Sequence, residues 1–227
     1  MVLAGSSRYG VVCCQEKLVS SDSMETRAEK KNLEFSLQQR PLQVVLVSPQ
    51  IPGNTGTTAR TCAAVLAGLH LVKPLGFSIE DSKLKRAGLD YWKYIVVKVH
   101  ESWPHFLDYF RQQEGEKRLI AYTKTGKCSY LDMSYKPGDW LVFGSETDGL
   151  APEIHEECST GVHAGGTVRI PMNDAFVRCL NLSVSVGIGV YEALRQLDRG
   201  RALGDIESER ELPRMLEDAH ASVDGFP

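Results

Sequence analysis

The sequence predicts an α/β protein built on a mostly parallel sheet. Short apolar runs rich in β-branched residues, such as QVVLV at 43–47, alternate along the chain with segments of helical spacing. Several of these runs lead directly into polar loops that contain glycine. Alternation of this kind is typical of parallel strands that are joined by crossover helices.

The composition is that of an ordinary soluble, globular protein. The chain has 227 residues, of which 42% are hydrophobic and 24% charged, enough for one main domain with a sizeable core. No apolar run approaches the roughly 20 residues that span a bilayer, which excludes a helical membrane protein. The six cysteines are scattered without a CxxC pair, which favours a reduced intracellular compartment. His155, Cys158 and His163 lack standard ligand spacing, so we interpret this stretch as a surface loop rather than a zinc site.

Polar segments flank the predicted domain, residues 42–197. Residues 1–41 are polar with little periodicity, so we expect a mobile extension. We expect a cytoplasmic protein. The early serines and scarce acids of the extension would also fit an organelle transit peptide, so plastid and mitochondrion are alternatives. Residues 198–227 carry eight acidic and four basic side chains and predict a solvated acidic tail.

The first unit is a strand, a glycine loop and a helix. The run 43–47 predicts a buried strand, and the prolines and glycines of SPQIPGNTG predict a tight loop. Residues 57–66 have the character of a packed helix closed by Gly68, and LHLVKP supplies a second strand. Such a loop presents backbone N–H groups to an anion. Its spacing fits neither G-x-G-x-x-G nor a Walker A loop, which argues against a nicotinamide-dependent oxidoreductase.

The middle of the chain adds three strands and a helix. Residues 94–99, 118–122 and 140–143 predict strands, and 103–110 predicts a helix. The last of these strands ends at Gly144 and opens a polar loop that carries Glu146 and Asp148. Open α/β sheets place their sites on loops at the carboxyl ends of buried strands, so Glu146 and Asp148 are candidate site residues.

The final unit is a strand and a long helix. VRIPM at 168–172 predicts the strand, and apolar residues at helical spacing predict a helix over 180–197. Gly187 and Gly189 lie inside this helix, where each costs about 1 kcal/mol relative to alanine. They indicate the close approach of another backbone or of a ligand, with a tightly packed core helix as the alternative.

Three of these segments together resemble the signature motifs of the SPOUT superfamily of RNA methyltransferases. They are PGNTGTTARTC, LVFGSETDGL and VRIPM followed by RCLNLSVSVGIGVYEA, and the segment KPLGFSIEDSKLKRAGLDYW is also similar. Within the superfamily the chain is similar to the tRNA (cytidine/uridine-2′-O-)-methyltransferases that modify the wobble nucleotide. The resemblance covers residues 42–197. It implies a Rossmann-like sheet with a C-terminal trefoil knot, a homodimer, S-adenosylmethionine as cofactor and tRNA as substrate, without a metal.

The resemblance also implies a cofactor site. S-adenosylmethionine would bind in a bent form against the knotted loops, mainly through backbone groups. The matching positions are Tyr122, Gly144, Gly149, Ile170, Met172, Cys179 and Leu180. Family members often have serine where this chain has Cys179, so only a backbone contact is expected there. This departure leaves open an RNA-binding protein that has lost catalysis, and a ribosomal RNA ribose methyltransferase is a further alternative.

The chemistry requires orientation of a ribose 2′-hydroxyl and removal of its proton as the new bond forms. The resemblance makes Arg60 the base, but a guanidinium group holds its proton strongly, so we prefer a clamp on an RNA phosphate. A phosphate oxygen or water would then accept the proton. Asn54 and Asn181 would orient the loop or the ribose, and Glu146 would bond backbone or hydroxyl groups. Purely local roles as turn or cap residues stay open for these three.

A basic segment supplies the predicted RNA surface. Between Lys73 and Lys98 there are six basic and three acidic residues. Charge and family likeness together point to Lys83, Lys85, Arg86 and Tyr91 as tRNA contacts. On charge alone, a solvated helix face is the preferred interpretation of the segment.

Overall fold

The computed structural model describes residues 41–78, 97–173 and 175–198. In these residues the strands form one seven-stranded sheet in the order β3-β2-β1-β6-β4-β7-β5. Neighbouring strands are all parallel, which confirms the predicted α/β class. The strands are β1 (Leu42–Val47), β2 (Gly68–Val72), β3 (Val97–His100), β4 (Arg118–Tyr122), β5 (Cys128–Ser129), β6 (Asp139–Phe143) and β7 (Ala164–Arg169). The helices are α2 (Pro52–Ala64), α4 (Trp103–Gln112), α5 (Pro152–Thr160) and α6 (Leu182–Asp198).

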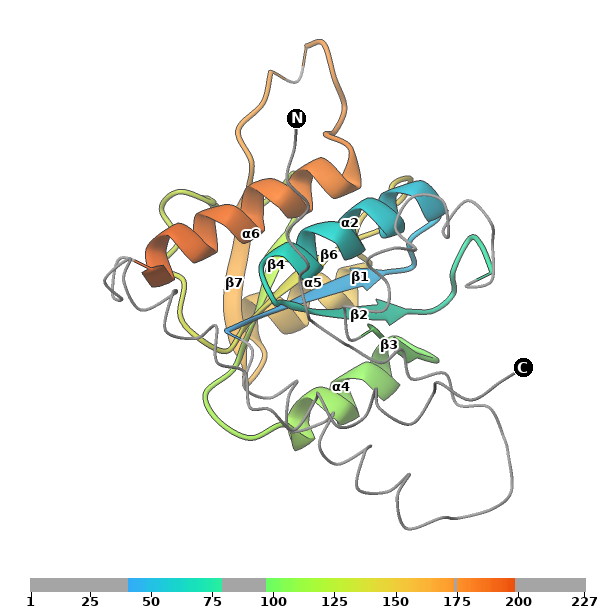
Figure 1. Ribbon diagram of the computed structural model, residues 1–227. Coiled ribbons are helices and arrows are strands. Elements are labelled where there is room, and N and C mark those ends of the chain that lie inside the picture. Colours follow the sequence, from blue (N-terminus) through green and yellow to red (C-terminus); the bar gives the residue numbers. More distant parts are fainter. Residues whose placement is uncertain (1–40, 79–96, 174, 199–227) are drawn as a thin grey trace, which may run out of the picture.

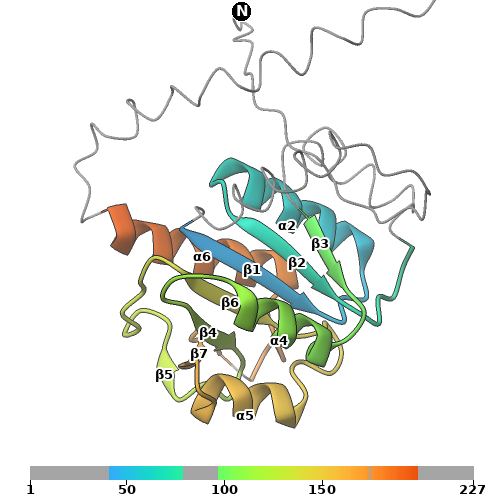
Figure 2. The same cartoon turned by 90° about the horizontal axis from the view of Figure 1, so that it is seen from below.

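The helices cover both faces of the sheet, α2 and α6 on one and α4 and α5 on the other (Figures 1 and 2). All six residues of β1 are buried because this central strand has a helix layer on each side. Val44 and Leu46 belong to the core under α2 and α6, and Val45 and Val47 to the core under α4 and α5. Burial of each such side chain stabilises the fold by roughly 1.5–3 kcal/mol.

Helix α2 begins earlier than the sequence predicted. Its first residue is Pro52, so the glycine-rich stretch expected as a tight loop forms its first turns. Proline fits the first helical position, where its missing N–H costs nothing. The prediction that Gly68 closes the helix is also wrong, because Leu66 takes the left-handed conformation (φ 55°) and Gly68 begins β2.

Strand β7 is displaced relative to the predicted strand 168–172. It starts at Ala164 and ends at Arg169, so Ile170 and Met172 lie in the following loop. The glycines at its start fit because another strand lies close: a Cβ on Gly165 would approach the Ile120 side chain to 2.5 Å. The extended conformation therefore reaches further toward the N-terminus than the apolar pattern indicated.

The interpretation of residues 155–163 as a surface loop is wrong for most of the stretch. His155 and Cys158 lie in helix α5, and His163 follows it. Ile154 and Cys158 face the core, and burial raises the pKa of the Cys158 thiol to about 12. In the described ranges, no group of three His, Cys, Asp or Glu residues is arranged to hold a metal ion.

The remaining predicted elements agree with the structure. Strand β4 has the predicted bounds, and α4 and α6 differ from prediction by a few residues at their ends. No helix in the described part of the chain is both long enough and apolar enough to cross a bilayer. Residues 1–40 of the predicted extension, residues 199–227 of the predicted tail and residues 94–96 of a predicted strand lie outside the described residues.

Candidate active site

Loops from four parallel strands meet at the carboxyl edge of the sheet. Because β1, β6, β4 and β7 are consecutive neighbours, the residues that follow them emerge side by side. The register pairs Tyr122 at the end of β4 with Phe143 of β6 and Val168 of β7. Gly144 and Ile170 therefore lie within two residues of Tyr122's partners, and three of the predicted cofactor positions come together.

Three predicted catalytic residues form one hydrogen-bonded chain. Glu146 Oε1 accepts from Asn54 Nδ2 at 2.8 Å, and Asn54 Oδ1 accepts from Asn181 Nδ2 at 2.8 Å. These residues come from the β6–α5 loop, the start of α2 and the residue before α6. The structure thus joins all three sequence motifs through side chains that lie far apart in the sequence.

Glu146 also holds the loop that leads into α2. Its Oε2 accepts from the backbone N–H of Gln50 at 2.7 Å, and its Oε1 accepts from that of Ile51 at 3.2 Å. Helix α2 has no side-chain cap of its own at Ile51. The bonds to backbone predicted for Glu146 are present, and the turn that follows it is instead closed by Ser145, whose Oγ accepts from Asp148 N–H at 3.0 Å.

Asn181 combines a local and a long-range role. Its Oδ1 caps α6 by accepting from the N–H of Ser183 at 2.9 Å and the Ser183 hydroxyl at 2.7 Å. The cap fixes the carbonyl end of the amide, so its Nδ2 is directed toward Asn54. The helix-cap alternative for Asn181 is therefore correct, and it also explains how the side chain is oriented.

The loop after β6 is tightly folded around two glycines. A Cβ on Gly144 would lie 2.1 Å from the carbonyl carbon of Gly149, so only glycine fits at position 144. Ser145 and Gly149 exchange backbone hydrogen bonds of 3.1 Å, and Gly149 has a positive φ of 70°. This packing leaves the backbone, rather than side chains, at the carboxyl end of β6.

The loop after β4 is seated on β7. Arg169 Nη1 donates to the carbonyl oxygens of Gly126 at 2.8 Å and Lys127 at 3.1 Å, and Thr123 N–H donates to Val168 O at 2.9 Å. A Cβ on Gly126 would lie 2.1 Å from the Val168 carbonyl carbon, so the two chain segments touch. Sequence reasoning missed Arg169 because it stands within an apolar motif and carries no spacing signal.

The other predicted residues are distributed around this edge. Arg60 is exposed on α2, about 9 Å along the helix axis from Asn54. A long loop joins β7 to α6 (Figure 1). Met172, Cys179 and Leu180 lie in this loop, and Cys179 is exposed. The predicted RNA contacts Lys83, Lys85, Arg86 and Tyr91 lie outside the described residues.

Residues 41–191 match the model of the SpoU rRNA Methylase family. The chain belongs to this family. Among curated relatives, a tRNA (cytidine(34)-2′-O)-methyltransferase of Polaromonas sp. is 48% identical over 153 residues, which span 67% of this chain and 89% of the relative. A protein of the same name from Burkholderia pseudomallei is 44% identical and covered to 94%. These matches confirm the predicted membership of the SPOUT methyltransferases.

Solved structures agree with this SpoU membership. One from a study of the 2-OH methylation of C/U34 on tRNA is 42% identical, with a TM-score of 0.61 over 70% of this chain and 97% of that chain. A SpoU methyltransferase of Streptomyces viridochromogenes in complex with AdoMet is 25% identical, with a TM-score of 0.62 over 69% of this chain and 58% of that chain.

Proposed function

We propose that this SpoU-family protein transfers a methyl group from S-adenosylmethionine to the ribose 2′-hydroxyl of the wobble nucleotide of tRNA, a cytidine or uridine. The observation that carries the proposal is the Glu146–Asn54–Asn181 chain, which unites the three motifs at the carboxyl edge of the sheet. The relatives that share the motifs at 43–48% identity are named for methylation of cytidine 34 of tRNA. The trefoil knot is an expectation that follows from the family.

The backbone at the sheet edge suits S-adenosylmethionine. Tyr122, Gly144 and Ile170 lie at or next to the ends of three neighbouring strands, and the Gly144–Gly149 turn has no room for a side chain at position 144. Gly149, Met172, Cys179 and Leu180 complete the proposed binding positions. When bound, the cofactor supplies an electrophilic methyl group on a sulfonium centre. Relatives of known structure with AdoMet bound support this assignment.

The side chains of the hydrogen-bonded chain orient other groups and do not remove protons. Both oxygens of Glu146 already accept from N–H donors, so we assign the carboxylate to fixing the α2 loop and Asn54. Asn54 is buried, and Asn181 is exposed beside it and available to the ribose. Arg60 is proposed to clamp an RNA phosphate, which aligns the 2′-hydroxyl, while a phosphate oxygen or water accepts the proton.

The partners of the protein are proposed to be tRNA and a second copy of the chain. Helix α6 exposes apolar side chains on its outer face, with Val184 at 49% and Tyr191 at 58% exposure. Between them, nothing lies within 4 Å of a Cβ built on Gly187, so a second backbone could approach closely there. Lys83, Lys85, Arg86 and Tyr91 are the proposed tRNA contacts.

Ribosomal RNA is the second candidate substrate. The family description names rRNA, and an rRNA methyltransferase of Sinorhizobium meliloti is 27% identical, with a TM-score of 0.61. The tRNA relatives are considerably more similar to this chain. We therefore favour tRNA.

The test is methyl transfer from labelled S-adenosylmethionine to unmodified tRNA and, in parallel, to ribosomal RNA, followed by mapping of the labelled nucleotide. We expect label on the ribose of nucleotide 34, reduced at least ~100-fold by Arg60→Ala, because a charge-assisted phosphate contact in the transition state is lost. Arg111→Ala is the matched control, since Arg111 is exposed on α4 and pairs with Asp108. Label on ribosomal RNA alone would favour the second candidate. Absence of transfer with retained tRNA binding would favour an RNA-binding protein that lacks catalysis.

A further inference from the structure

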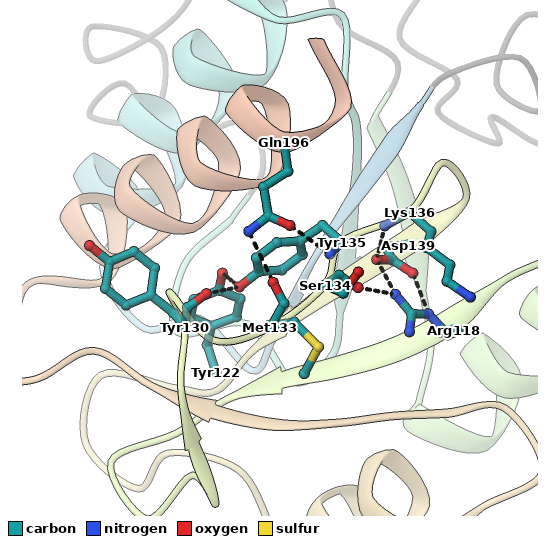
Figure 3. Close-up of polar contacts among 9 residues, drawn as sticks. All are labelled: Arg118, Tyr122, Tyr130, Met133, Ser134, Tyr135, Lys136, Asp139 and Gln196. Carbon is teal, nitrogen blue, oxygen red and sulfur yellow. Dashed lines mark hydrogen bonds and ion pairs between the residues drawn. The ribbon is translucent and has the colours of Figure 1, made fainter. Parts of the chain in front are cut away.

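The segment between β5 and β6 is held by a network of polar groups in which the side chains of Tyr122, Tyr135 and Asp139 are buried (Figure 3). The hydroxyl oxygens of Tyr122 and Tyr135 lie 2.6 Å apart, and the Tyr135 hydroxyl lies 3.1 Å from the carbonyl oxygen of Tyr130. A carbonyl only accepts, so Tyr135 donates its single proton to Tyr130. Tyr122 must therefore be the donor in the shorter bond, which gives the chain Tyr122 → Tyr135 → Tyr130 a fixed direction.

Gln196, near the end of α6, completes the network. Its Oε1 accepts from the N–H of Tyr135 at 3.0 Å, and its Nε2 donates to the carbonyl of Met133 at 2.9 Å and to Glu192 at 2.8 Å. This one amide satisfies two backbone groups of a segment that belongs to no strand. The position of 133–135 is thereby tied to α6.

The same segment is anchored at its other end. Arg118 forms two bonds to Asp139, of 2.8 and 2.7 Å, and donates to Ser134 O at 2.9 Å, while Lys136 N–H donates to Asp139 at 2.8 Å. Asp139 is buried, and its carboxylate raises the pKa of Arg118. Residues 134–136 are therefore clamped to the amino ends of β4 and β6, and the Tyr135 hydroxyl has a fixed location.

Tyr122 connects this network to the carboxyl edge of the sheet. Its backbone ends β4, and its ring is buried and stacked on Phe143 with centroids 4.6 Å apart. The ring also lies against α6, where a Cβ on Gly189 would approach it to 2.6 Å. Burial raises the pKa of both tyrosines, so both hydroxyls stay protonated and able to donate at neutral pH.

We infer that Tyr135 and Gln196 are positioning residues for the methyl donor. They fix the Tyr122 ring, and the ring fixes the main chain from which the loop 123–127 begins. Arg169 holds the far end of that loop through Gly126 and Lys127. The inference rests on the proposed function, since it is that proposal which puts the cofactor against Tyr122. It adds residues outside the three motifs to the cofactor site.

Tyr135→Phe provides the test. It leaves the buried Tyr122 hydroxyl without an acceptor and the Tyr130 carbonyl without its donor. We expect the Kd and KM for S-adenosylmethionine to rise about tenfold, and kcat at saturating cofactor and the KM for tRNA to change less than about twofold. Gln196→Met, which keeps the side-chain volume without the amide, should raise the same two constants. Binding is measured by calorimetry and turnover by methyl transfer.

Two further variants separate positioning from general stability. Tyr130→Phe removes a hydroxyl that points away from the network (Figure 3) and keeps the carbonyl, so cofactor affinity should stay within about twofold of wild type. Tyr122→Phe combined with Tyr135→Phe removes the unpaired donor, so the double variant should bind more tightly than Tyr135→Phe alone.

The outcomes are distinguishable. A lower Tm for Tyr135→Phe and Gln196→Met with unchanged cofactor affinity of the folded protein would show a merely structural network and overturn the inference alone. A wild-type protein that does not bind S-adenosylmethionine would overturn the inference and the proposed function together. Should one variant fail to fold, the other still decides the question.

Discussion

Helices α4 and α2, which lie on opposite faces of the sheet, differ in how they begin. On one face, α4 is capped locally, because Ser102 accepts from the N–H of His105 at 3.3 Å. On the other face, α2 has no side-chain cap of its own, and the N–H groups before it are held by Glu146 from a distant loop. Asn181 caps α6 and also bonds Asn54. A helix whose start is held from elsewhere in the sequence is positioned relative to other loops, as a site requires.

The two faces also differ in what they bury. Under α4 the core is aromatic: the ring of Phe106 lies 4.9 Å from Trp103 and 5.8 Å from Trp140, between centroids. Under α2 and α6 the side chains are small at the closest approaches, as at Ala59 and Gly189. We therefore expect the α4 and α5 face to contribute mainly stability. The α2 and α6 face should contribute the geometry on which activity depends.

The largest expected effect is on the aromatic face. Phe106→Ala removes a fully buried ring, which should lower the free energy of unfolding by about 3–5 kcal/mol. Urea denaturation measures this loss. The turnover of the folded fraction at low temperature should stay near wild type, because Phe106 packs in the core under α4 and α5, on the face of the sheet opposite α2 and α6. A matching fall in turnover per folded molecule would show that the α4 and α5 face also contributes to activity.

Glu146→Gln should have the opposite profile. The amide keeps the shape of the side chain but weakens the charge-assisted bonds to Gln50, Ile51 and Asn54. We expect methyl transfer to fall about 100-fold, which corresponds to about 2.7 kcal/mol of transition-state stabilisation, with a smaller change in Tm. Single-turnover kinetics and thermal melting are measured on the same preparation. Full activity of the variant would show that methyl transfer does not need the Glu146 carboxylate.

Two glycines of α6 differ in what surrounds them. Gly189→Ala would bring a Cβ to 2.6 Å from the Tyr122 ring, whereas Gly187→Ala meets no atom within 4 Å. We expect Gly189→Ala to lower the free energy of unfolding by about 1–3 kcal/mol. Gly187→Ala should raise it by up to about 1 kcal/mol, because alanine favours a helix more than glycine does. Urea titration measures both, and sedimentation reports any change of assembly caused by the Gly187 variant. Equal effects would mean that Tyr122 can move aside.

Much of the fold could be predicted because the strands are short, apolar and β-branched. β4 has the predicted bounds, since its buried residues are bordered by polar ones. The start of α2 could not be predicted, because Gly53 and Gly56 disfavour a helix locally. Packing, which buries Gly56 and Thr55, compensates for this low helix propensity. α5 was missed because only Ile154 and Cys158 of its residues are buried, too few for a periodic pattern.

The candidate site also contains residues that the sequence could predict and residues that it could not. Resemblance of the motifs identified Asn54, Glu146 and Asn181, and the structure shows that they touch. No spacing rule could pair them, because each follows or precedes a different strand. Tyr135 and Gln196 gave no signal at all: one lies in an irregular segment, and the other resembles an ordinary polar residue of a helix. Their roles depend on hydrogen bonds between segments that lie far apart in the sequence.

The smallest predicted effect concerns a histidine pair on the α4 face. His100 Nε2 lies 3.0 Å from His70 Nδ1, and His70 Nε2 lies 3.3 Å from Gln43 Oε1, so in the neutral pair each ring carries its proton on Nε2. Burial, with Lys98 and His105 nearby, lowers the pKa of His100 to about 3, and burial with His100 nearby lowers that of His70. Protonation is therefore available mainly to the unfolded chain.

The pH dependence follows from this difference. Between the unfolded pKa of about 6.5 and the folded value, the unfolded chain binds more protons, so the stability present above pH 6.5 is lost as the pH falls. His100→Gln removes one of the two groups. From pH 6.5 to 5.5 the variant should therefore lose about 1 kcal/mol less unfolding free energy than wild type. Urea titrations at both pH values measure this, with His163→Gln, which lies outside the pair, as control. An identical pH dependence of wild type and His100→Gln would mean that the folded protein accepts the proton, and that the aromatic face opens more readily than its packing indicates.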